Sequence, residues 1–417
     1  MTTFPNFRRT SNLPLDPNKQ NGCMNESAYV VKKDLDSYPL WKGEGPPTAH
    51  LDIELTERCN NACIHCCINR PAGDKRSRAR ELDTDAWKDI LRQAAELGVM
   101  TVRFTGGEPL LRDDFPELYL FARRLGLKVM LFTNARLITP QIADLLADIP
   151  PLEDIEISVY GMRRKSYEAV TGVDGSYAGF LSGVQCLLDR KIPFVVKGAL
   201  LPPNKKEMAQ FAAWAATNPR MDALPAYAMF FDLRGRHDSA AKNSRIRRLR
   251  VSPEEGLEIL TRHPDSYRKE MSEFFEKFLS PPGDRLFNCG IGPGCVDAYG
   301  VFQSCLSLRC PDLTFDLKKG ALKEAVASGF PRLKEMRAAN PLYLERCARC
   351  FLRGFCEQCP AKSWSEHGTL DTPVEYFCRV AHAQARFLGL VMEEERAWDV
   401  RDSKERIQNL KRRVKAS

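Results

Sequence analysis

The sequence predicts an α/β protein built as a partial (β/α)6 barrel that is followed by a small cysteine-rich domain. Three observations carry this prediction. Apolar strands alternate with amphipathic helices six times between residues 49 and 232, at intervals of about 30 residues. The strands are almost wholly apolar, which is typical of buried parallel strands. Nine of the 15 cysteines lie between residues 286 and 380.

The strands and helices of the barrel can be placed from their periodicity and their end signals. The helix that starts at Thr139 has Thr as its N-cap and Pro140 at its first position, and another helix ends at Gly98. Six repeats suit an open or partial barrel better than a closed barrel of eight. The expected strands are 50–55, 99–104, 129–134, 155–160, 194–201 and 226–231. The expected helices are 84–98, 115–126, 139–149, 175–190 and 207–216.

Four further segments surround the barrel, which spans residues 49–232. Residues 1–48 are rich in Pro, Asn and Lys and predict an irregular arm with one short strand at 28–31. Residues 233–285 predict a charged linker with helices at 254–262 and 271–279. In residues 286–380 helical periodicity fades and cysteines accumulate. Residues 381–417 predict a charged helix over 383–399 and a basic tail.

Composition excludes several classes of protein. The net charge is +8, and two basic runs, 244–250 and 410–417, are interpreted as a solvated loop and a frayed tail. They lack interleaved aromatic residues, so a nucleic-acid partner is not expected. No apolar run reaches the ~20 residues of a membrane helix, and the N-terminus lacks the apolar core of a secretory signal. The expected compartment is the cytoplasm, where cysteines serve as metal ligands more often than as disulfides.

The first cysteine group follows the first strand and has the spacing C-x3-C-x2-C, at Cys59, Cys63 and Cys66. Active sites of β/α barrels lie at the carboxyl ends of the strands, so the position suits catalysis. A 4Fe–4S cluster normally takes four cysteines, so three leave one iron open to a ligand. A zinc site would need a fourth ligand, and Cys67 or His65 could supply it.

This loop and the end of the second strand resemble the radical SAM superfamily. The second strand ends in TGGEPLL, where Gly106 and Gly107 permit a close backbone approach. The resemblance places this turn against the methionine part of S-adenosylmethionine (SAM) and pairs Glu108 with the SAM amino group. It also implies SAM contacts from three polar residues on later strands, Asn134, Ser158 and Lys197. Glu54, Glu156 and Asp232, which lie at or near strand ends, are given no role.

The resemblance implies a specific chemistry. The reduced cluster passes one electron to SAM and leaves a 5′-deoxyadenosyl radical, which takes a hydrogen atom from an unactivated C–H bond. The protein's part is to hold SAM, exclude water and aim the radical.

The later cysteines resemble the SPASM domain, which carries two auxiliary 4Fe–4S clusters, so that the chain would hold three clusters in all. The interval between the last two cysteines of the run C-x2-C-x5-C-x2-C is one residue shorter than usual. Two zinc-ribbon halves are the alternative interpretation of this run. The resemblance gives the nearer auxiliary cluster to Cys289, Cys295, Cys305 and Cys359. It gives the outer auxiliary cluster to Cys347, Cys350, Cys356 and Cys378.

The resemblance limits the substrate less closely than the chemistry. It implies a peptide or protein substrate that receives a crosslink, an epimerisation or an oxidation, and an electron donor such as flavodoxin or ferredoxin. Only 48 residues precede the barrel, so leader recognition is expected from a separate protein or from barrel loops. The alternatives are a radical SAM enzyme that acts on a small cofactor precursor, and a zinc-binding scaffold protein. Four cysteines have no assigned role: Cys23, Cys67, Cys186 and Cys310.

Metal analysis separates these interpretations. Three 4Fe–4S clusters predict about twelve irons per chain after anaerobic reconstitution, and about eight when Cys59, Cys63 and Cys66 are all replaced by Ala. Iron, sulfide and zinc are measured on both proteins. One to about three zinc ions per chain with little iron would support the scaffold protein instead.

Overall fold

The structure is a computed structural model of the chain. It describes residues 49–416 except 67, 69, 222–224, 226, 231–232, 234–238, 279–281, 288–293, 354 and 357–358. The strand expected at 28–31 lies outside the described residues. None of the helices in the described part of the chain is long and apolar enough to span a bilayer.

Six parallel strands form the expected partial barrel. They lie side by side in chain order, and all five pairings between neighbours are parallel. The fold class predicted from the sequence is therefore confirmed. The strands are β1 (His50–Thr56), β4 (Thr101–Gly106), β5 (Lys128–Thr133), β6 (Leu152–Val159), β7 (Val195–Ala199) and β8 (Tyr227–Ala228).

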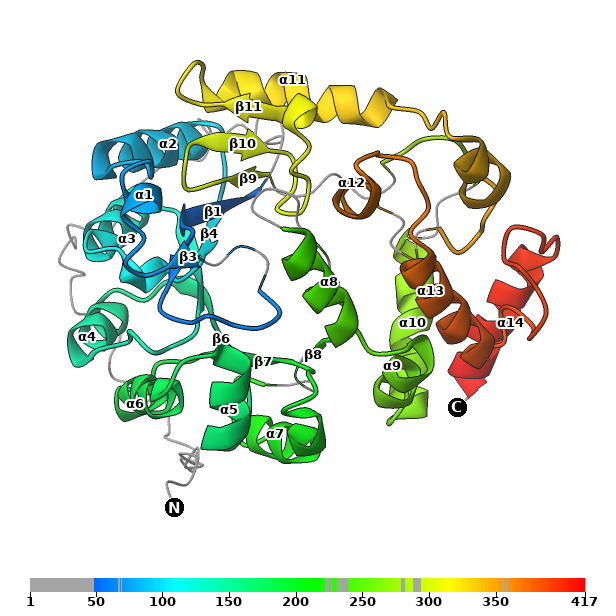
Figure 1. Cartoon of the computed structure of the whole chain (residues 1–417), viewed down its shortest axis with the longest axis horizontal. Helices are drawn as coiled ribbons and strands as arrows, with labels where there is room; N and C mark the ends of the chain where they lie inside the picture. The colour runs from blue at the N-terminus through cyan, green and yellow to red at the C-terminus, as the bar shows by residue number, and fades with distance from the viewer. Residues whose placement is uncertain are drawn as a thin grey trace, which may run out of the picture. The chain divides into compact units, whose positions relative to one another are not determined.

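Helices cover the outer face of this sheet (Figure 1). The alternation along β1 shows why: Leu51, Ile53 and Leu55 are wholly buried on one face, and Asp52 and Glu54 lie on the other. The structure has every helix expected in the barrel and adds two, the short α1 and α5, that the periodicity did not predict. The helices are α1 (Lys75–Arg78), α2 (Thr84–Glu96), α3 (Phe115–Arg124), α4 (Pro140–Asp148), α5 (Arg164–Thr171), α6 (Ser176–Asp189) and α7 (Met208–Ala215).

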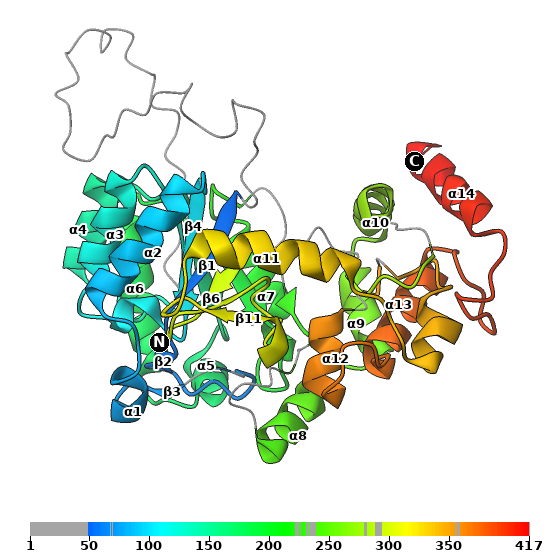
Figure 2. The same cartoon turned by 90° about the horizontal axis from the view of Figure 1, so that it is seen from above.

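Three further strands extend the sheet beyond β1. They come from the cysteine-rich stretch and give the order β11-β10-β9-β1, with β9 parallel to β1 (Figure 1). Figure 2 shows the molecule from above, with β1 and β11 labelled. They are β9 (Cys295–Val296), β10 (Val301–Gln303) and β11 (Thr314–Asp316). A short separate sheet pairs β2 (Arg58–Cys59) with β3 (Arg70–Pro71). The barrel's compact unit therefore includes Pro293–Phe302 and Phe315–Val326.

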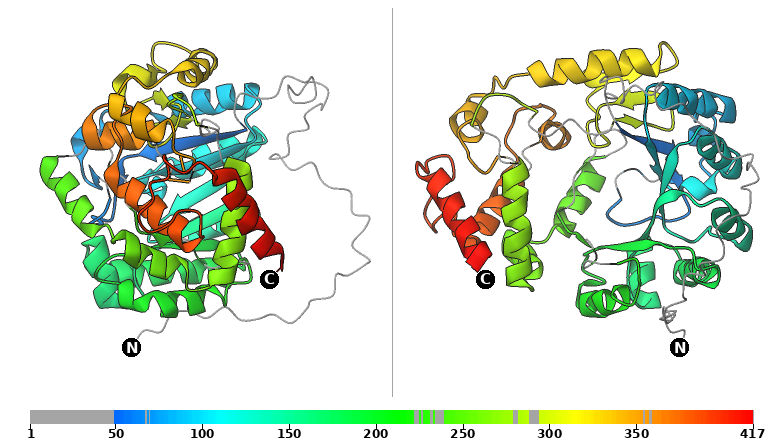
Figure 3. Two further views of the ribbon diagram at one scale, coloured as in Figure 1. Left: turned by 90° about the vertical axis from the view of Figure 1, so that its right-hand side faces the viewer. Right: turned by 180° about the vertical axis from the view of Figure 1, so that it is seen from behind.

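The second compact unit is mainly helical, and here several expectations are wrong. The run 244–250 belongs to a helix and not to a loop. The expected helix 383–399 starts earlier and ends at Phe387, because Gly389 follows with a φ of 72°. The tail 410–417 is largely helical. The helices of the second unit are α8 (Ala240–Leu249), α9 (Pro253–Leu260), α10 (Pro264–Phe278), α12 (Pro360–His367), α13 (Glu375–Phe387) and α14 (Ser403–Ala416) (Figure 3). Helix α11 (Leu322–Glu335) begins in the first unit and ends in the second.

The C-terminal helix forms because it has an apolar stripe. Ile407, Leu410 and Val414 recur at helical spacing and join one apolar cluster with Tyr267 and Leu390. The basic residues occupy the other positions of the helix. The many basic residues of this segment therefore led to the prediction of a frayed tail, although its apolar stripe makes it a packed helix.

Gly183 on α6 marks a contact that tolerates no side chain. A Cβ there would overlap the carbonyl oxygen of Ala135, which has a positive φ of 65°. We expect Gly183→Ala to lower the free energy of unfolding by about 3 kcal/mol, because either the helix or the loop must move. The change is measured by urea unfolding. Gly73→Ala is the control, since nothing lies within 4 Å of that position, and a loss as large there would contradict the packing argument.

Candidate functional site

The first cysteine loop is tied to the barrel at both sides. Arg58 at its start binds Glu81 through Nε and Nη2, with N–O distances of 3.0–3.3 Å, and both side chains are buried. Further along, the amides of Ala62 and Ile64 donate to carbonyl oxygens at the end of α5, at 2.8 and 3.0 Å. The loop that holds the cysteines is thus fixed by backbone hydrogen bonds to a helix that the sequence analysis did not find.

The three predicted thiols of this loop lie close enough to affect one another. The pKa of Cys59 is raised to about 12, mainly by burial, with smaller contributions from Glu108 and Cys66. Burial also raises the pKa of Cys63, and Cys66 and Cys59 add to the rise. Such a group binds protons tightly unless positive charge is supplied between the sulfur atoms, which is what a bound iron cluster does.

Backbone packing explains why positions 106 and 107 are both glycine. A Cβ at Gly106 would overlap the carbonyl oxygen of Thr56, and a Cβ at Gly107 would overlap that of Arg58. The backbone here passes directly against the end of β1, with Gly107 N donating to Thr56 O at 2.7 Å. The sequence predicted that the two glycines let the backbone approach a ligand closely. In the structure they also let the backbone of the turn pack against the start of the cysteine loop.

Glu108 lies completely buried and joins two strand ends. Its carboxylate accepts hydrogen bonds from Thr133 Oγ1 at 2.8 Å and from Asn134 N at 2.8 Å. Burial raises the pKa of Glu108 to about 7, although these donors oppose the rise. Asn134 in turn directs its side-chain amide toward Asn60 Oδ1 at 2.8 Å and Cys59 Sγ at 3.7 Å. The structure thus brings together Glu108, Asn134 and the first cysteine; their contacts with SAM stay predictions.

Ser158 and Lys197 face the same side of the sheet, because they are register partners on β6 and β7. Lys197 forms an ion pair with Glu156 and lies 3.7 Å from the centre of the Phe132 ring. Burial lowers the pKa of Lys197. The sequence analysis gave Glu156 no role, although its place two residues before Ser158 puts it on the same face.

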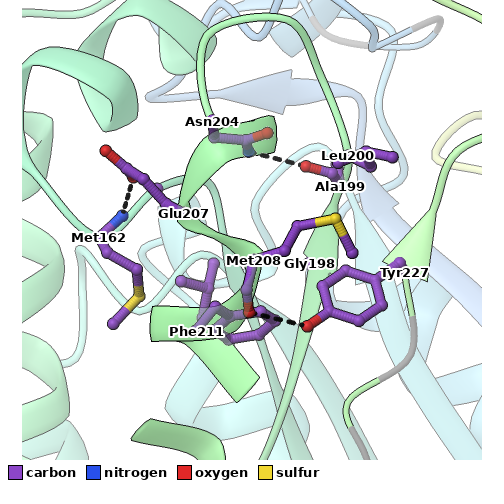
Figure 4. Close-up of a pocket in the computed structure, with 11 residues that line it drawn as sticks. Met162, Gly198, Ala199, Leu200, Asn204, Glu207, Met208, Phe211 and Tyr227 are labelled. Atoms are coloured by element: carbon purple, nitrogen blue, oxygen red, sulfur yellow. Dashed lines mark hydrogen bonds between the residues drawn. The ribbon is translucent and has the colours of Figure 1, made fainter. Parts of the chain in front are cut away.

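A pocket with about 270 Å³ of empty space, partly open to solvent, lies at the carboxyl ends of β6, β7 and β8 (Figure 4). Two polar residues that the sequence analysis missed shape it. Asn204 donates to the carbonyl oxygens of Tyr160 and Ala199, and Glu207 accepts from Met162 N at 2.7 Å. Met208 and Phe211 of α7 line it, so the pocket lies on the helix side of the sheet.

Four cysteines of the second unit line one pocket, which has about 370 Å³ of empty space including open solvent. They are the outer cysteine group: Cys347, Cys350, Cys356 and Cys378. The pKa values of Cys347 and Cys350 are both raised to about 12, mainly by burial and in part by Cys378. The structure thus brings together the four residues assigned to the outer cluster.

The other predicted ligands are only partly described. Cys305 and Cys359 pack in one apolar cluster that also contains Cys310. Burial raises the pKa of Cys359 to about 11, the amides of Lys362 and Ala361 lower it, and Cys305 raises it. Cys359 therefore lies near Cys305, as its assignment to the nearer cluster requires. Cys295 is buried in β9 of the first unit, and Cys289, Cys23 and Cys67 lie outside the described residues. Cys186, which has no assigned role, lies on α6 and is half-buried.

The kind of metal group that these residues suit can be tested on the geometry. Among the described residues, no three His, Cys, Asp or Glu side chains converge on one point as the ligands of a single metal ion do. A zinc ion needs its ligands within about 2.3 Å of one atom. A 4Fe–4S cluster instead takes one thiolate at each iron, so its ligands surround a volume. The outer cysteine group around its pocket fits a cluster.

Fold and site together define a partial β/α barrel with a three-cysteine loop at the carboxyl edge of its sheet. Residues 53–215 match the family model of the Radical SAM superfamily.

Known proteins resemble this chain over part of its length or in fold. The AdoMet-dependent heme synthase of Methanosarcina barkeri is 29% identical over 187 residues, 45% of this chain and 52% of that protein. The PqqA peptide cyclase of Gluconobacter oxydans is 34% identical over 169 residues, 40% of this chain and 46% of that protein. The matches thus span about half the length of these curated relatives. The structure of anSMEcpe with bound AdoMet is similar in fold, with a TM-score of 0.55, 14% identity and coverage of 88% of this chain and 97% of that one.

The raised pKa of Glu108 predicts a pH-dependent stability. An unfolded Glu loses its proton near pH 4.5 and the folded one near pH 7, so the folded state holds the extra proton between these values. The free energy of unfolding should therefore fall as pH rises from about 5 to 7, by about 1 kcal/mol per pH unit. Glu108→Gln should remove this slope in urea unfolding measured at half-unit steps of pH.

Glu117→Gln is the matched control for that prediction. Glu117 is a half-exposed carboxylate on α3 that binds Lys88, and its replacement should leave the slope as in the wild type. A slope that survives in Glu108→Gln would show that another group binds the proton.

Proposed function

We propose that the chain is a radical SAM enzyme that cleaves SAM reductively and abstracts a hydrogen atom from a peptide or protein substrate. The product would be a post-translational modification such as a crosslink, an epimerisation or an oxidation. The observation that carries the proposal is the closeness of Cys59, Cys63 and Cys66 to one another and to the Gly106–Glu108 turn, at the carboxyl edge of a partial barrel.

The first cysteine loop would hold a 4Fe–4S cluster through three thiolates and leave its fourth iron open for SAM. When bound, this group supplies the electron that converts SAM to methionine and a 5′-deoxyadenosyl radical. The chain's own contribution is positional. Asn134 presents an amide N–H to Cys59 Sγ, and the hydrogen bonds to α5 hold the loop still. Burial of Cys59 and Cys63 keeps water from the sulfur atoms.

SAM would bind along the strand ends next to this loop. We assign its amino group to Glu108, whose carboxylate accepts hydrogen bonds from three donors and can accept a further one. Ser158 and Lys197 would contact SAM from the neighbouring strands, and for Lys197 this requires release of its ion pair with Glu156.

Two auxiliary 4Fe–4S clusters are part of the proposal. The outer cysteine group supplies four ligands around one pocket. The nearer cluster would use Cys289, Cys295, Cys305 and Cys359, for which the closeness of Cys305 and Cys359 gives support. Four ligands leave no open iron, so these clusters would carry electrons or stabilise the second unit and would not bind substrate.

A peptide substrate is favoured by the names of two similar proteins. One curated relative is a PqqA peptide cyclase, and one solved structure of anSMEcpe, with a TM-score of 0.54 to this chain, holds AdoMet and the Kp18Cys peptide. A small cofactor precursor is the second candidate, because another relative is an AdoMet-dependent heme synthase. An electron donor such as flavodoxin or ferredoxin would supply the reducing electron. A separate leader-recognition protein would present the peptide.

Helix α8 offers a contact for an acidic leader. Arg245, Arg247 and Arg248 are exposed on it. The side chain of Ile246 is buried and fixes the helix, so the arginines project from a rigid element. Charge complementarity of this kind speeds association more than it adds affinity.

The activity is tested by reductive cleavage of SAM. The anaerobically reconstituted protein with dithionite and SAM should release 5′-deoxyadenosine, measured by chromatography. Replacing Cys59, Cys63 and Cys66 by Ala should reduce the release to the level without protein. Cys186→Ala is the control, because this half-buried cysteine on α6 has no place in the site. Equal release by the triple variant would refute the proposal.

The substrate class is tested by isotope transfer. A short peptide encoded beside the gene is synthesised with deuterium on its carbon atoms and added to the same reaction. Deuterium in the recovered 5′-deoxyadenosine would show hydrogen abstraction from the peptide. Transfer only from deuterated small molecules would favour the cofactor-precursor alternative.

A further inference from the structure

Arg346 forms part of the wall of the pocket that the outer cysteine group surrounds. Its Nη2 atom lies 3.7 Å from Cys378 Sγ, within hydrogen-bond reach of a sulfur acceptor. Its Nε atom is buried and has no hydrogen-bond partner among the described residues. A buried N–H without an acceptor is costly, by about 1–3 kcal/mol, so this donor indicates a missing acceptor at the pocket wall.

Two neighbours hold the guanidinium in place. Glu375 accepts from Nη1 at 2.5 Å and from Nη2 at 3.1 Å, which is a bidentate pair. The Trp398 ring lies 4.6 Å from the guanidinium carbon. The guanidinium keeps its positive charge at any working pH, as arginine does throughout proteins. The arginine is therefore a fixed cation beside the sulfur and not a mobile surface residue.

Arg353 is a second arginine in the wall of the same pocket. Its Nη1 donates to Gly283 O, and its buried Nε also lacks a partner among the described residues. Both arginines lower the pKa of Cys347, against the larger effect of burial. Two guanidinium groups, each with an unused N–H, thus line a pocket with four thiols.

His382 adds a neutral polar contact. Its Nε2 atom accepts a hydrogen bond from Ala397 N at 3.1 Å, so the proton resides on Nδ1. Nδ1 donates to the carbonyl oxygen of Cys378 at 2.8 Å and lies 3.6 Å from Cys378 Sγ. Arg346 and Arg353 are therefore the cations that line the pocket.

We propose that Arg346 and Arg353 donate hydrogen bonds to the sulfur atoms of the iron–sulfur cluster held by the outer cysteine group and raise its reduction potential. The inference rests on the proposed function, because it requires a cluster at these four cysteines. One-electron reduction adds a negative charge to the cluster, and nearby cations stabilise the reduced form more than the oxidised form. A raised potential makes this cluster an acceptor of electrons within the chain.

The two partners in the ion pair have opposite effects on this potential. Arg346 is a cation whose Nη2 atom lies 3.7 Å from Cys378 Sγ, whereas Glu375 is the anion bound to it, so the two charges act on the cluster with opposite signs. Removing the cation should lower the reduction potential, and removing the carboxylate should raise it. A side chain that only supported the local fold would not give shifts of opposite sign.

The test is an anaerobic potentiometric titration of the reconstituted full chain, monitored by electron paramagnetic resonance. Cys378→Ser first identifies which signal belongs to the outer cysteine group. For that signal, Arg346→Gln should reduce the ratio of reduced to oxidised cluster at fixed potential about tenfold, which is about 59 mV for one electron. Glu375→Gln should increase the ratio about threefold, a smaller change because Glu375 is more than half exposed and screened by solvent.

Arg349→Gln is the matched control. It removes the same charge from the same segment, but Arg349 is exposed and lies 3.8 Å from Asp399. In Arg349→Gln the ratio of reduced to oxidised cluster should change less than about twofold. Retained iron content in all three variants shows that the shifts come from charge and not from loss of the cluster.

The outcomes separate the two proposals. If Cys378→Ser changes neither iron content nor any signal, no cluster is held there and the proposed auxiliary cluster fails. If the signal is assigned but Arg346→Gln leaves the potential unchanged or raises it, the inference fails while the function stands. Should Arg346→Gln not fold, the exposed Glu375→Gln decides alone, and an unchanged or lowered ratio there overturns the inference.

Discussion

The site depends on one close backbone contact, between the Gly106–Gly107 turn and the end of β1. The amides of Gly107 and Glu108 donate to the carbonyl oxygens of Thr56 and Arg58 at 2.7 and 2.9 Å. Any side chain at either glycine would separate these backbones. Because the cysteine loop starts at the same residues, this contact fixes the loop beside the turn. The buried carboxylate of Glu108 then joins the turn to the next strand end through Thr133 and Asn134.

The buried thiols of the two cysteine regions have different polar groups beside them. In the barrel, uncharged groups approach the sulfur: Asn61 N lies 3.3 Å and Asn134 Nδ2 lies 3.7 Å from Cys59 Sγ. In the outer cysteine group, fixed arginines do so. Dipoles stabilise a thiolate less than full positive charges do at the same distance. The two environments therefore favour clusters of different electron affinity.

Much of the barrel could be predicted, because each strand and helix carries its own signal. Helix α2 buries Trp87, Ile90 and Leu91, the residues that its periodicity placed on one face. Helix α5 was missed because it is only eight residues long and has few apolar residues, and yet it anchors the cysteine loop. Helix α14 was taken for a frayed tail because its apolar stripe is sparse among basic residues. Its packing depends on α10, which is far away in the sequence.

The sequence by itself determined the cysteine spacings, the glycine pair and the order of the six strands, because each of these is a local pattern. Only the tertiary structure decided which distant side chains meet. Arg346 directly precedes Cys347 in the chain. Its contact with Cys378, which lies 32 residues later, depends on how α13 packs. Likewise, Glu156 meets Lys197 through the pairing of β6 with β7. Such contacts arise from strand register and helix packing, which depend on the whole fold and not on neighbouring residues in the chain.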